Sequence, residues 1–264
     1  MILDERSSAA PALAPGYLAW TGRDTRTNVL PIADGTAFGD KQTLDERSSR
    51  VDARSTGASV SESTRETVPL GPALAVLPGG GLNVAWTGTN GHLNVQGITK
   101  VTLDETSPVA PALCAAGGEL VLAWIGTDRR LNVARSESGR FGPPVVLDET
   151  SDAAPALCWT GGNAVVAWTG TDRHLNVLTG DGRVFSAPTV LDERSPTGPA
   201  LAPAAQGLAV GWTGGDRRVN LLIGDHKQVL DAKSSLAPAL CAFDGQLLLA
   251  WTGTDHRVNV TAVA

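Results

Sequence analysis

A tryptophan mark that recurs six times constrains the fold of this chain more than any other feature. Each tryptophan is followed by threonine or isoleucine and then glycine, and the six positions are Trp20, Trp86, Trp124, Trp168, Trp212 and Trp251. A Pro-Ala-Leu mark and a Leu-Asp-Glu mark (Leu-Asp-Ala in one case) alternate with the tryptophans in constant order. Three marks in one order, spaced by about 44 residues, are typical of a repeat protein whose units stack on one another.

The repeat between Pro155 and Asp192 indicates what one unit forms. It divides at Gly and Asp turns into four short runs, at residues 155–160, 164–169, 175–178 and 184–191. Short apolar or β-branched runs between such turns predict strands joined by hairpins. No stretch shows the 3.6-residue period of an amphipathic helix. The run at 120–125 is apolar throughout, which predicts a strand with both faces buried.

Four-stranded antiparallel sheets, buried on both faces and repeated six times, predict an all-β fold, a six-bladed β-propeller. The last repeat has no fourth strand before Ala264, whereas residues 1–4 match the end of a fourth strand. We therefore predict that the N-terminal strand completes the last blade and closes the ring, which removes two exposed sheet edges.

Composition favours a single propeller domain over residues 1–264, with a polar insertion in blade 2 at about residues 50–70. The hydrophobic fraction of 42% is sufficient for a core, and the net charge of −6 argues against nucleic acid as a partner. No apolar run approaches the ~18 residues of a membrane span, so we expect no membrane partner. The oligomeric state, monomer or dimer, stays open.

The three cysteines, Cys114, Cys158 and Cys241, occupy one equivalent position in three repeats. An odd number of equivalent positions predicts free, buried thiols. The chain starts inside a repeat, so we expect no signal peptide. We therefore expect a cytoplasmic protein, or a secreted one if a leader has been removed.

Two turns between third and fourth strands, at residues 33–38 and 179–185, resemble degenerate Asp-boxes, the Ser-x-Asp-x-Gly-x-Thr-Trp turns of sialidase-like propellers; residues 136–141 are a weaker match. The whole chain is similar to bacterial tandem-repeat propellers, some of them lectins, with an AWTGTD…LNV repeat. The resemblance implies the propeller fold and a structural role for these turns. The sialidase catalytic set does not carry over, because no Phe-Arg-Ile-Pro motif is present and Tyr17, the single tyrosine, lies in the turn between the first two strands.

Two rings of polar residues are expected on the face that the strand 2–3 and strand 4–1 loops share. The first contains the Asp and Ser of Asp-Glu-x-Ser, and the second contains the hairpin Asp or Asn followed two residues later by Arg26, His92, Arg130, His174, Arg218 and Arg257. Asp, Asn and Ser fix tight turns through hydrogen bonds to the backbone, and we interpret both rings mainly in this way. The alternative is a binding rim that includes Arg130, His174 and Arg218.

Function is better sought where the repeat is broken. The insertion could place Arg50, Asp52, Arg54, Arg65 and Glu66 over the mouth of the axial channel, or it could be a loop without a binding role. On the opposite face, Trp159 and Tyr17 could stack on a sugar, although such a ring more often fills a gap between blades.

The sequence leaves three function classes open. The first is a ligand-binding propeller, lectin-like or specific for a small molecule, with its site at the axial funnel or between blades. The second is a cofactor-independent cyclase, isomerase or hydrolase with an axial pocket lidded by residues 50–70. The third is a protein-interaction scaffold with an acidic rim. The histidine-bearing loops lie too far apart to converge on one metal ion, and no catalytic or cofactor motif is recognised, so no metal or cofactor is expected.

Overall fold

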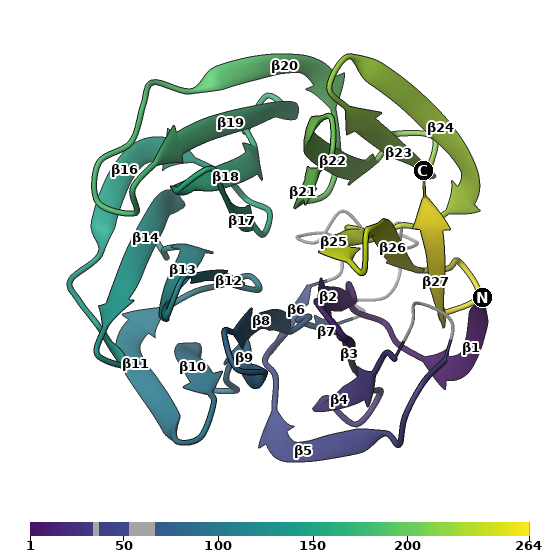
Figure 1. The fold of residues 1–264 in the computed structure, drawn as a ribbon, viewed down its shortest axis with the longest axis horizontal. Helices are drawn as coiled ribbons and strands as arrows, with labels where there is room; N and C mark the ends of the chain where they lie inside the picture. Colours follow the sequence, from purple (N-terminus) through teal and green to yellow (C-terminus); the bar gives the residue numbers. More distant parts are fainter. Residues whose placement is uncertain (34–36, 53–66, 264) are drawn as a thin grey trace.

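The structure is a computed structural model, and it describes residues 1–33, 37–52 and 67–263. Six sheets are arranged around a central axis like the blades of a propeller (Figure 1). All regular structure in the described ranges is β-strand. The predicted all-β, six-bladed propeller with antiparallel blades is therefore confirmed.

Each of the first three blades has its strands in chain order from the axis outward. Blade 1 consists of β2 (Ala12–Ala14), β3 (Tyr17–Thr21), β4 (Arg26–Pro31) and β5 (Gln42–Arg47). Blade 2 consists of β8 (Ala73–Leu77), β9 (Gly81–Thr87), β10 (His92–Gln96) and β11 (Lys100–Thr106). Blade 3 consists of β12 (Ala112–Ala116), β13 (Glu119–Ile125), β14 (Arg130–Glu137) and β16 (Val145–Thr150), with a short β15 (Arg140–Phe141) beside the end of β14.

The remaining three blades repeat this plan. Blade 4 consists of β17 (Ala156–Thr160), β18 (Asn163–Thr169), β19 (His174–Gly180) and β20 (Thr189–Arg194). Blade 5 consists of β21 (Ala200–Ala204), β22 (Gly207–Thr213), β23 (Arg218–Ile223) and β24 (His226–Lys233). Blade 6 consists of β25 (Ala239–Phe243), β26 (Gln246–Thr252), β27 (Arg257–Val263) and the N-terminal strand β1 (Ile2–Arg6).

The N-terminal strand closes the ring, as the sequence predicts. β1 pairs antiparallel with β27, and Ile2 lies opposite Asn259 (Figure 1). The backbone N–H of Val260 donates to the carbonyl of Met1 at 3.0 Å, and the amino terminus of Met1 donates to the carbonyl of Val260 at 2.6 Å. The first residues of the chain therefore pair with nearly the last described ones.

Six buried hydrophobic clusters lie between the blades, one at each interface of the described chain. Each cluster contains one of the repeat tryptophans, which packs against the preceding blade. Trp168 of blade 4, for example, belongs to a cluster with Ile125 and Val133 of blade 3. Five of the tryptophans are at most 2% exposed, whereas Trp251 is half-buried. The repeated tryptophan is therefore the main packing residue between blades.

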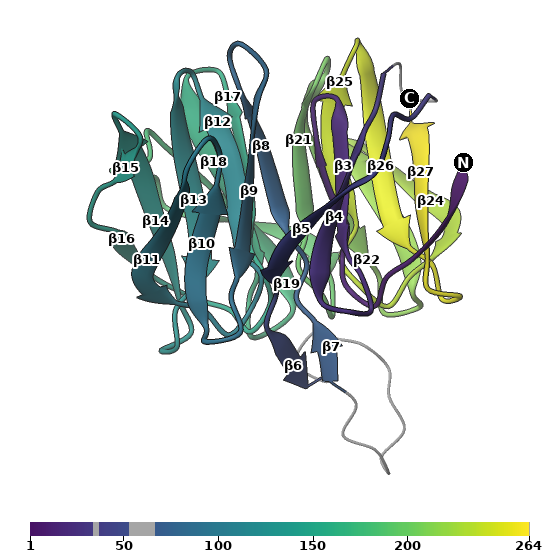
Figure 2. The ribbon, with the colours of Figure 1, turned by 90° about the horizontal axis from the view of Figure 1, so that it is seen from below.

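A short hairpin outside the blades comes from the insertion in blade 2. β6 (Arg50–Asp52) pairs with β7 (Thr67–Pro69), and together they project from the face formed by the strand 2–3 and strand 4–1 loops (Figure 2). Arg54, Arg65 and Glu66, which the sequence analysis places in a lid, lie outside the described residues.

The fourth strand of blade 4 is shorter than expected. The sequence predicts it from Val184, but β20 begins at Thr189. The preceding segment is held in a turn, because Asp181 Oδ1 accepts hydrogen bonds from the backbone N–H groups of Arg183 and Val184, both at 2.8 Å. Both hydrogen bonds lower the pKa of the Asp181 carboxyl group, and the bond from Val184 has the larger effect. The apolar Val184 therefore belongs to a loop.

Candidate functional site

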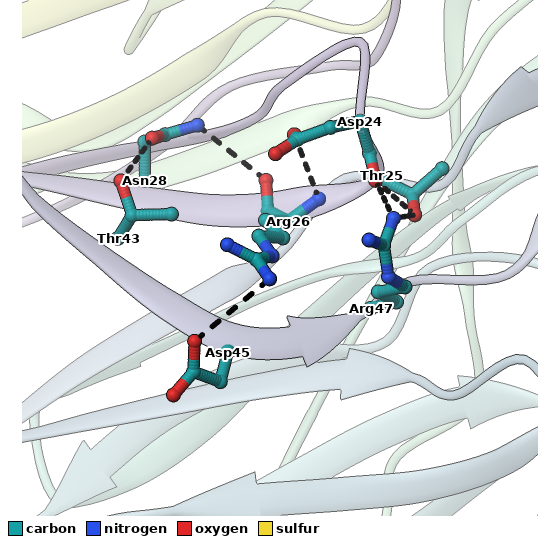
Figure 3. A network of polar contacts seen from close by, with 7 residues as sticks. All are labelled: Asp24, Thr25, Arg26, Asn28, Thr43, Asp45 and Arg47. Atoms are coloured by element: carbon teal, nitrogen blue, oxygen red, sulfur yellow. Dashed lines mark hydrogen bonds and ion pairs between the residues drawn. The ribbon is translucent and has the colours of Figure 1, made fainter.

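A hydrogen-bonded network recurs at the hairpin between the second and third strands of each blade. In blade 1, shown in Figure 3, Asp24 Oδ1 accepts from the backbone N–H of Arg26 at 3.2 Å. Asn28 donates to the carbonyl of Arg26 at 3.4 Å and accepts from Thr43 Oγ1 at 2.8 Å. The side chain of Arg26 lies 4.0 Å from Asp45 on β5. These contacts provide hydrogen-bond partners for the polar groups of the turn and join β4 to β5.

The glycine after each tryptophan mark is required by this network. A Cβ atom on Gly170 would lie 2.8 Å from Asp172 Oδ1 and 3.1 Å from Asn176 Nδ2. Closely similar contacts occur at the five equivalent positions, Gly22, Gly88, Gly126, Gly214 and Gly253. Since every blade uses this arrangement for its own turn, the hairpin Asp ring has a structural role, as we interpret it from the sequence.

Adjacent blades are joined on the same face by side-chain hydroxyl groups. The threonine after the tryptophan mark donates to a backbone carbonyl of the next blade's strand 4–1 loop at 2.6–2.8 Å, and the pairs are Thr21–Leu70, Thr87–Val109, Thr169–Thr197, Thr213–Leu236 and Thr252–Ala9. In blade 3 the equivalent residue is Ile125, which has no hydroxyl group. The interface between blades 3 and 4 therefore lacks this bond.

An open groove of about 670 Å³ lies at that interface. Its lining includes the apolar residues Val109, Ile125 and Pro196, together with Val51 of β6. The full lining is Val51, Pro108, Val109, Ile125, Arg129, Ser151, Asp152, Ala153, Thr169, Gly170, Thr171, Arg173, Ser195 and Pro196. Since the lining comes from both strand 2–3 and strand 4–1 loops, the two loop sets share one face, as predicted. The volume is within the ~300–1,000 Å³ range of small-ligand sites.

Charged side chains form the exposed rim of this groove. Arg129 Nη2 lies 2.6 Å from Asp152 Oδ2, and both side chains are more than half exposed. Arg173 also lines the groove and is exposed. Both arginines have positive φ, 70° and 69°. Their carbonyls accept hydrogen bonds from the N–H groups of Ser151 and Ser195, so the turns that position the two guanidinium groups are anchored to their own blades.

The groove's serine and threonine hydroxyls are mostly occupied. Ser151 Oγ donates to the carbonyl of Thr169 at 2.7 Å, and Ser195 Oγ donates to the carbonyl of Thr213 at 2.8 Å. Thr169 Oγ1 donates to the carbonyl of Thr197. These hydroxyls therefore hold the blades together. The groups available to a ligand are the two guanidinium groups, the Asp152 carboxylate and the exposed Thr171.

The axial cavity on this face is much smaller. It has a volume of about 60 Å³ and is lined by residues that precede the inner strands, among them the small residues Ala10, Ala110, Ala154 and Gly198. The inner walls approach so closely that a Cβ on Gly198 would lie 2.2 Å from the carbonyl oxygen of Ala154. Of the two predicted locations, the space between blades has the volume of a small-ligand site, whereas the axial cavity that the described residues line does not.

A further hollow of about 420 Å³ lies between blades 1 and 2. There Lys100 pairs with Glu46 at 2.7 Å, and its Nζ lies 5.5 Å from the centre of the Trp86 ring. Lys227 pairs with Glu193 and lies over Trp212 in the same way between blades 4 and 5. A lysine thus covers the tryptophan at both positions.

The structure separates three predicted rim residues. Arg130 pairs with Asp148 of its own blade, and His174 Nδ1 lies 2.8 Å from Asp172 Oδ2, which lowers the pKa of Asp172. Arg218 donates its backbone N–H to Asp216 Oδ1 at 3.0 Å. Each residue belongs to a different blade, and none of the three lines the groove.

Four other predicted residues lie elsewhere. Arg50 donates to Thr67 Oγ1 and to its carbonyl, and so joins β6 to β7, whereas Asp52 ends β6. Tyr17 is the first residue of β3, not a turn residue, and packs with blades 1 and 2. Trp159 is half-buried between blades 3 and 4, with the Arg135 guanidinium 5.1 Å from its ring centre.

Sequence reasoning missed Arg129, Asp152 and Arg173. A signal was present, because Ile125 replaces the threonine of the other five repeats and Asp152 is the charged member of a position that is otherwise Ser or Pro. The insertion and the aromatic residues are the breaks in the repeat where a site is expected from the sequence. Single substitutions at shared positions mark the groove instead.

Comparison with known proteins gives likeness in fold alone. No protein-family model matches the chain, and no curated protein matches its sequence. The fungal lectin of Aleuria aurantia, a six-bladed β-propeller with a novel fucose recognition mode, has a TM-score of 0.64 at 9% identity, over 99% of this chain and 92% of that one. The chain shares the fold of this lectin.

Two further solved structures are similar. A variant of AofleA from Arthrobotrys oligospora with three arginines changed to alanine has a TM-score of 0.70 at 11% identity, over 98% of this chain and 83% of AofleA. The SapL1 lectin in complex with α-methyl fucoside has a TM-score of 0.59 at 11% identity, over 100% of this chain and 94% of that one. At these identities the likeness shows the propeller fold.

Within residues 1–33, 37–52 and 67–263, no three His, Cys, Asp or Glu side chains are grouped so that they could hold a metal ion. No helix in the described part of the chain is long and apolar enough to cross a membrane.

Proposed function

We propose that this protein is a lectin-like binding propeller whose ligand is a glycan or a similar hydroxyl-rich molecule, and that the groove between blades 3 and 4 is its binding site. The observation that supports this most is the combination of apolar lining residues with the charged side chains of Arg129, Asp152 and Arg173 in one groove. A sugar has an apolar face and a set of hydroxyl groups. Guanidinium groups and carboxylates form charge-assisted hydrogen bonds with such hydroxyls.

The similarity to lectin propellers supports the ligand class. Two solved propellers of this fold are lectins, one crystallised with α-methyl fucoside and one described by its fucose recognition. Fold alone does not determine function, so the proposal for this chain depends on the groove. No feature of the described residues favours the enzyme alternative, since its axial pocket has only about 60 Å³.

The test is glycan-array binding followed by calorimetric titration of the strongest binder with groove variants. We expect Arg173→Ala to weaken binding at least tenfold, since a hydrogen bond to a charged group contributes roughly 1.5–3 kcal/mol. Asp152→Ala should also weaken binding, because it removes an acceptor and frees Arg129 from its ion pair.

The matched control is Arg217→Ala. Arg217 occupies the same turn position in blade 5, with a φ of 66°, but does not line the groove. It should leave the affinity unchanged. The absence of any glycan ligand, or equal losses in Arg173→Ala and Arg217→Ala, would contradict the proposal.

A further inference from the structure

The charges around the groove are unevenly balanced. Arg129 is neutralised by Asp152, at 2.6 Å. Arg173 also lines the groove, and no carboxylate lies within ion-pair distance of it among the described residues. The nearest acid in sequence, Asp172, is engaged by His174 instead. The groove therefore has one unpaired positive charge in a chain whose net charge is −6.

Among the residues at its turn position, Arg173 is the arginine that lines the groove and has no ion pair in the described chain. The same turn position contains Thr25, Gly91, Arg129, Arg173, Arg217 and His256 in the six blades. Arginine occurs there only in blades 3, 4 and 5. Of these three arginines, one is paired and one lies outside the groove, which leaves Arg173 as the free cation of the site.

We infer that the ligand of this groove contains one anionic group, a carboxylate or a sulfate, that pairs with Arg173. The planar guanidinium group binds either anion through two parallel hydrogen bonds. Since Arg129 and Asp152 neutralise each other, Arg173 leaves the rim with one net positive charge, which matches one anionic group. The inference rests on the proposed function and narrows its ligand class to acidic saccharides, either uronate or sulfated.

The experiment uses an array on which neutral oligosaccharides are printed beside their uronate and sulfated derivatives, followed by titration of the best acidic binder and its neutral parent. We expect the acidic member to bind at least tenfold more tightly at low salt. The advantage should decrease between about 50 and 300 mM salt, because the pair is solvent-exposed. The uronate and sulfate arms distinguish the two sources of charge.

Two variants locate the effect. Arg173→Gln should abolish the preference for the acidic member while the neutral parent still binds, and Arg217→Gln should preserve the preference. The inference is overturned if neutral and acidic members bind equally, or if both variants lose the preference alike. If the inference fails in this way but Asp152→Ala still weakens saccharide binding, the proposed function stands. If the protein binds no saccharide at all, the inference and the proposed function are both overturned.

Discussion

The serine that follows each fourth strand occupies one position in six blades but does not have the same bonds everywhere. Ser151 Oγ donates to the carbonyls of Thr169 and Ala153, and accepts from the backbone N–H of Ala153. Ser48, in the blade before the insertion, is 1% exposed and its hydroxyl has no partner. There the backbone N–H of Ser49 donates to the Thr87 carbonyl at 2.8 Å and replaces the missing hydroxyl bond.

This difference predicts different effects of the same substitution. Ser151→Ala should lower the free energy of unfolding by about 1–2 kcal/mol, since it leaves three backbone groups with fewer partners, the Thr169 carbonyl and the carbonyl and N–H of Ala153. Ser48→Ala should change it by less than about 0.5 kcal/mol, because no bond is lost. Urea denaturation of both variants measures this. Equal losses would mean that Ser48 has a partner in solution.

At the scale of the element, the turn between second and third strands depends on a close contact. Gly214 must have no Cβ, because that atom would lie 2.8 Å from Asp216 Oδ1 and 3.0 Å from Asn220 Nδ2. A Cβ atom on the neighbouring Gly215 would have no contact within 4 Å, and Gly215 does not have a positive φ. Steric contact therefore requires glycine at position 214, whereas the surroundings of position 215 leave room for a side chain.

The pair gives a prediction for the hairpin. Gly214→Ala should destabilise the protein by about 1–3 kcal/mol through overpacking. Gly215→Ala should be neutral or stabilising by up to about 1 kcal/mol, because it restricts the unfolded chain. Thermal unfolding of the two variants separates these outcomes. A harmless Gly214→Ala would show that the Asp–Asn network can move away from the turn.

Most strands were predictable because each has an apolar run between turn residues. β17 and β18 differ from the predicted 155–160 and 164–169 by only one residue at their first ends. β20 was placed too early, since the turn bonds of Asp181 override the strand preference of Val184. The hairpin of β6 and β7 was not predicted, because a polar insertion has no repeat against which to align its strands.

At the scale of the whole molecule, the number of blades and the closure by β1 follow from the repeat. The binding site does not, because a repeat describes what all blades share. The groove depends on Ile125 and Asp152, each of which differs from its counterparts by one side chain. The pairing of Asp152 with Arg129, and the freedom of Arg173, are three-dimensional relations between blades that the sequence order does not show.

On this proposal, the sixfold scaffold has one binding site. Equivalent turns and tryptophans recur around the ring, but the rim of Arg129, Asp152 and Arg173 occurs between blades 3 and 4. At Trp86 and at Trp212, by contrast, a lysine that is paired with a glutamate covers the tryptophan ring. Sites built on shared residues would instead be several per chain and would bind multivalent ligands by avidity.

The stoichiometry of binding tests this claim most directly. Isothermal titration of the full chain with a monovalent saccharide identified on the array should give one ligand per chain, and Arg173→Ala should weaken that single binding event at least tenfold. A stoichiometry of several ligands per chain, or an affinity that Arg173→Ala leaves unchanged, would contradict the account.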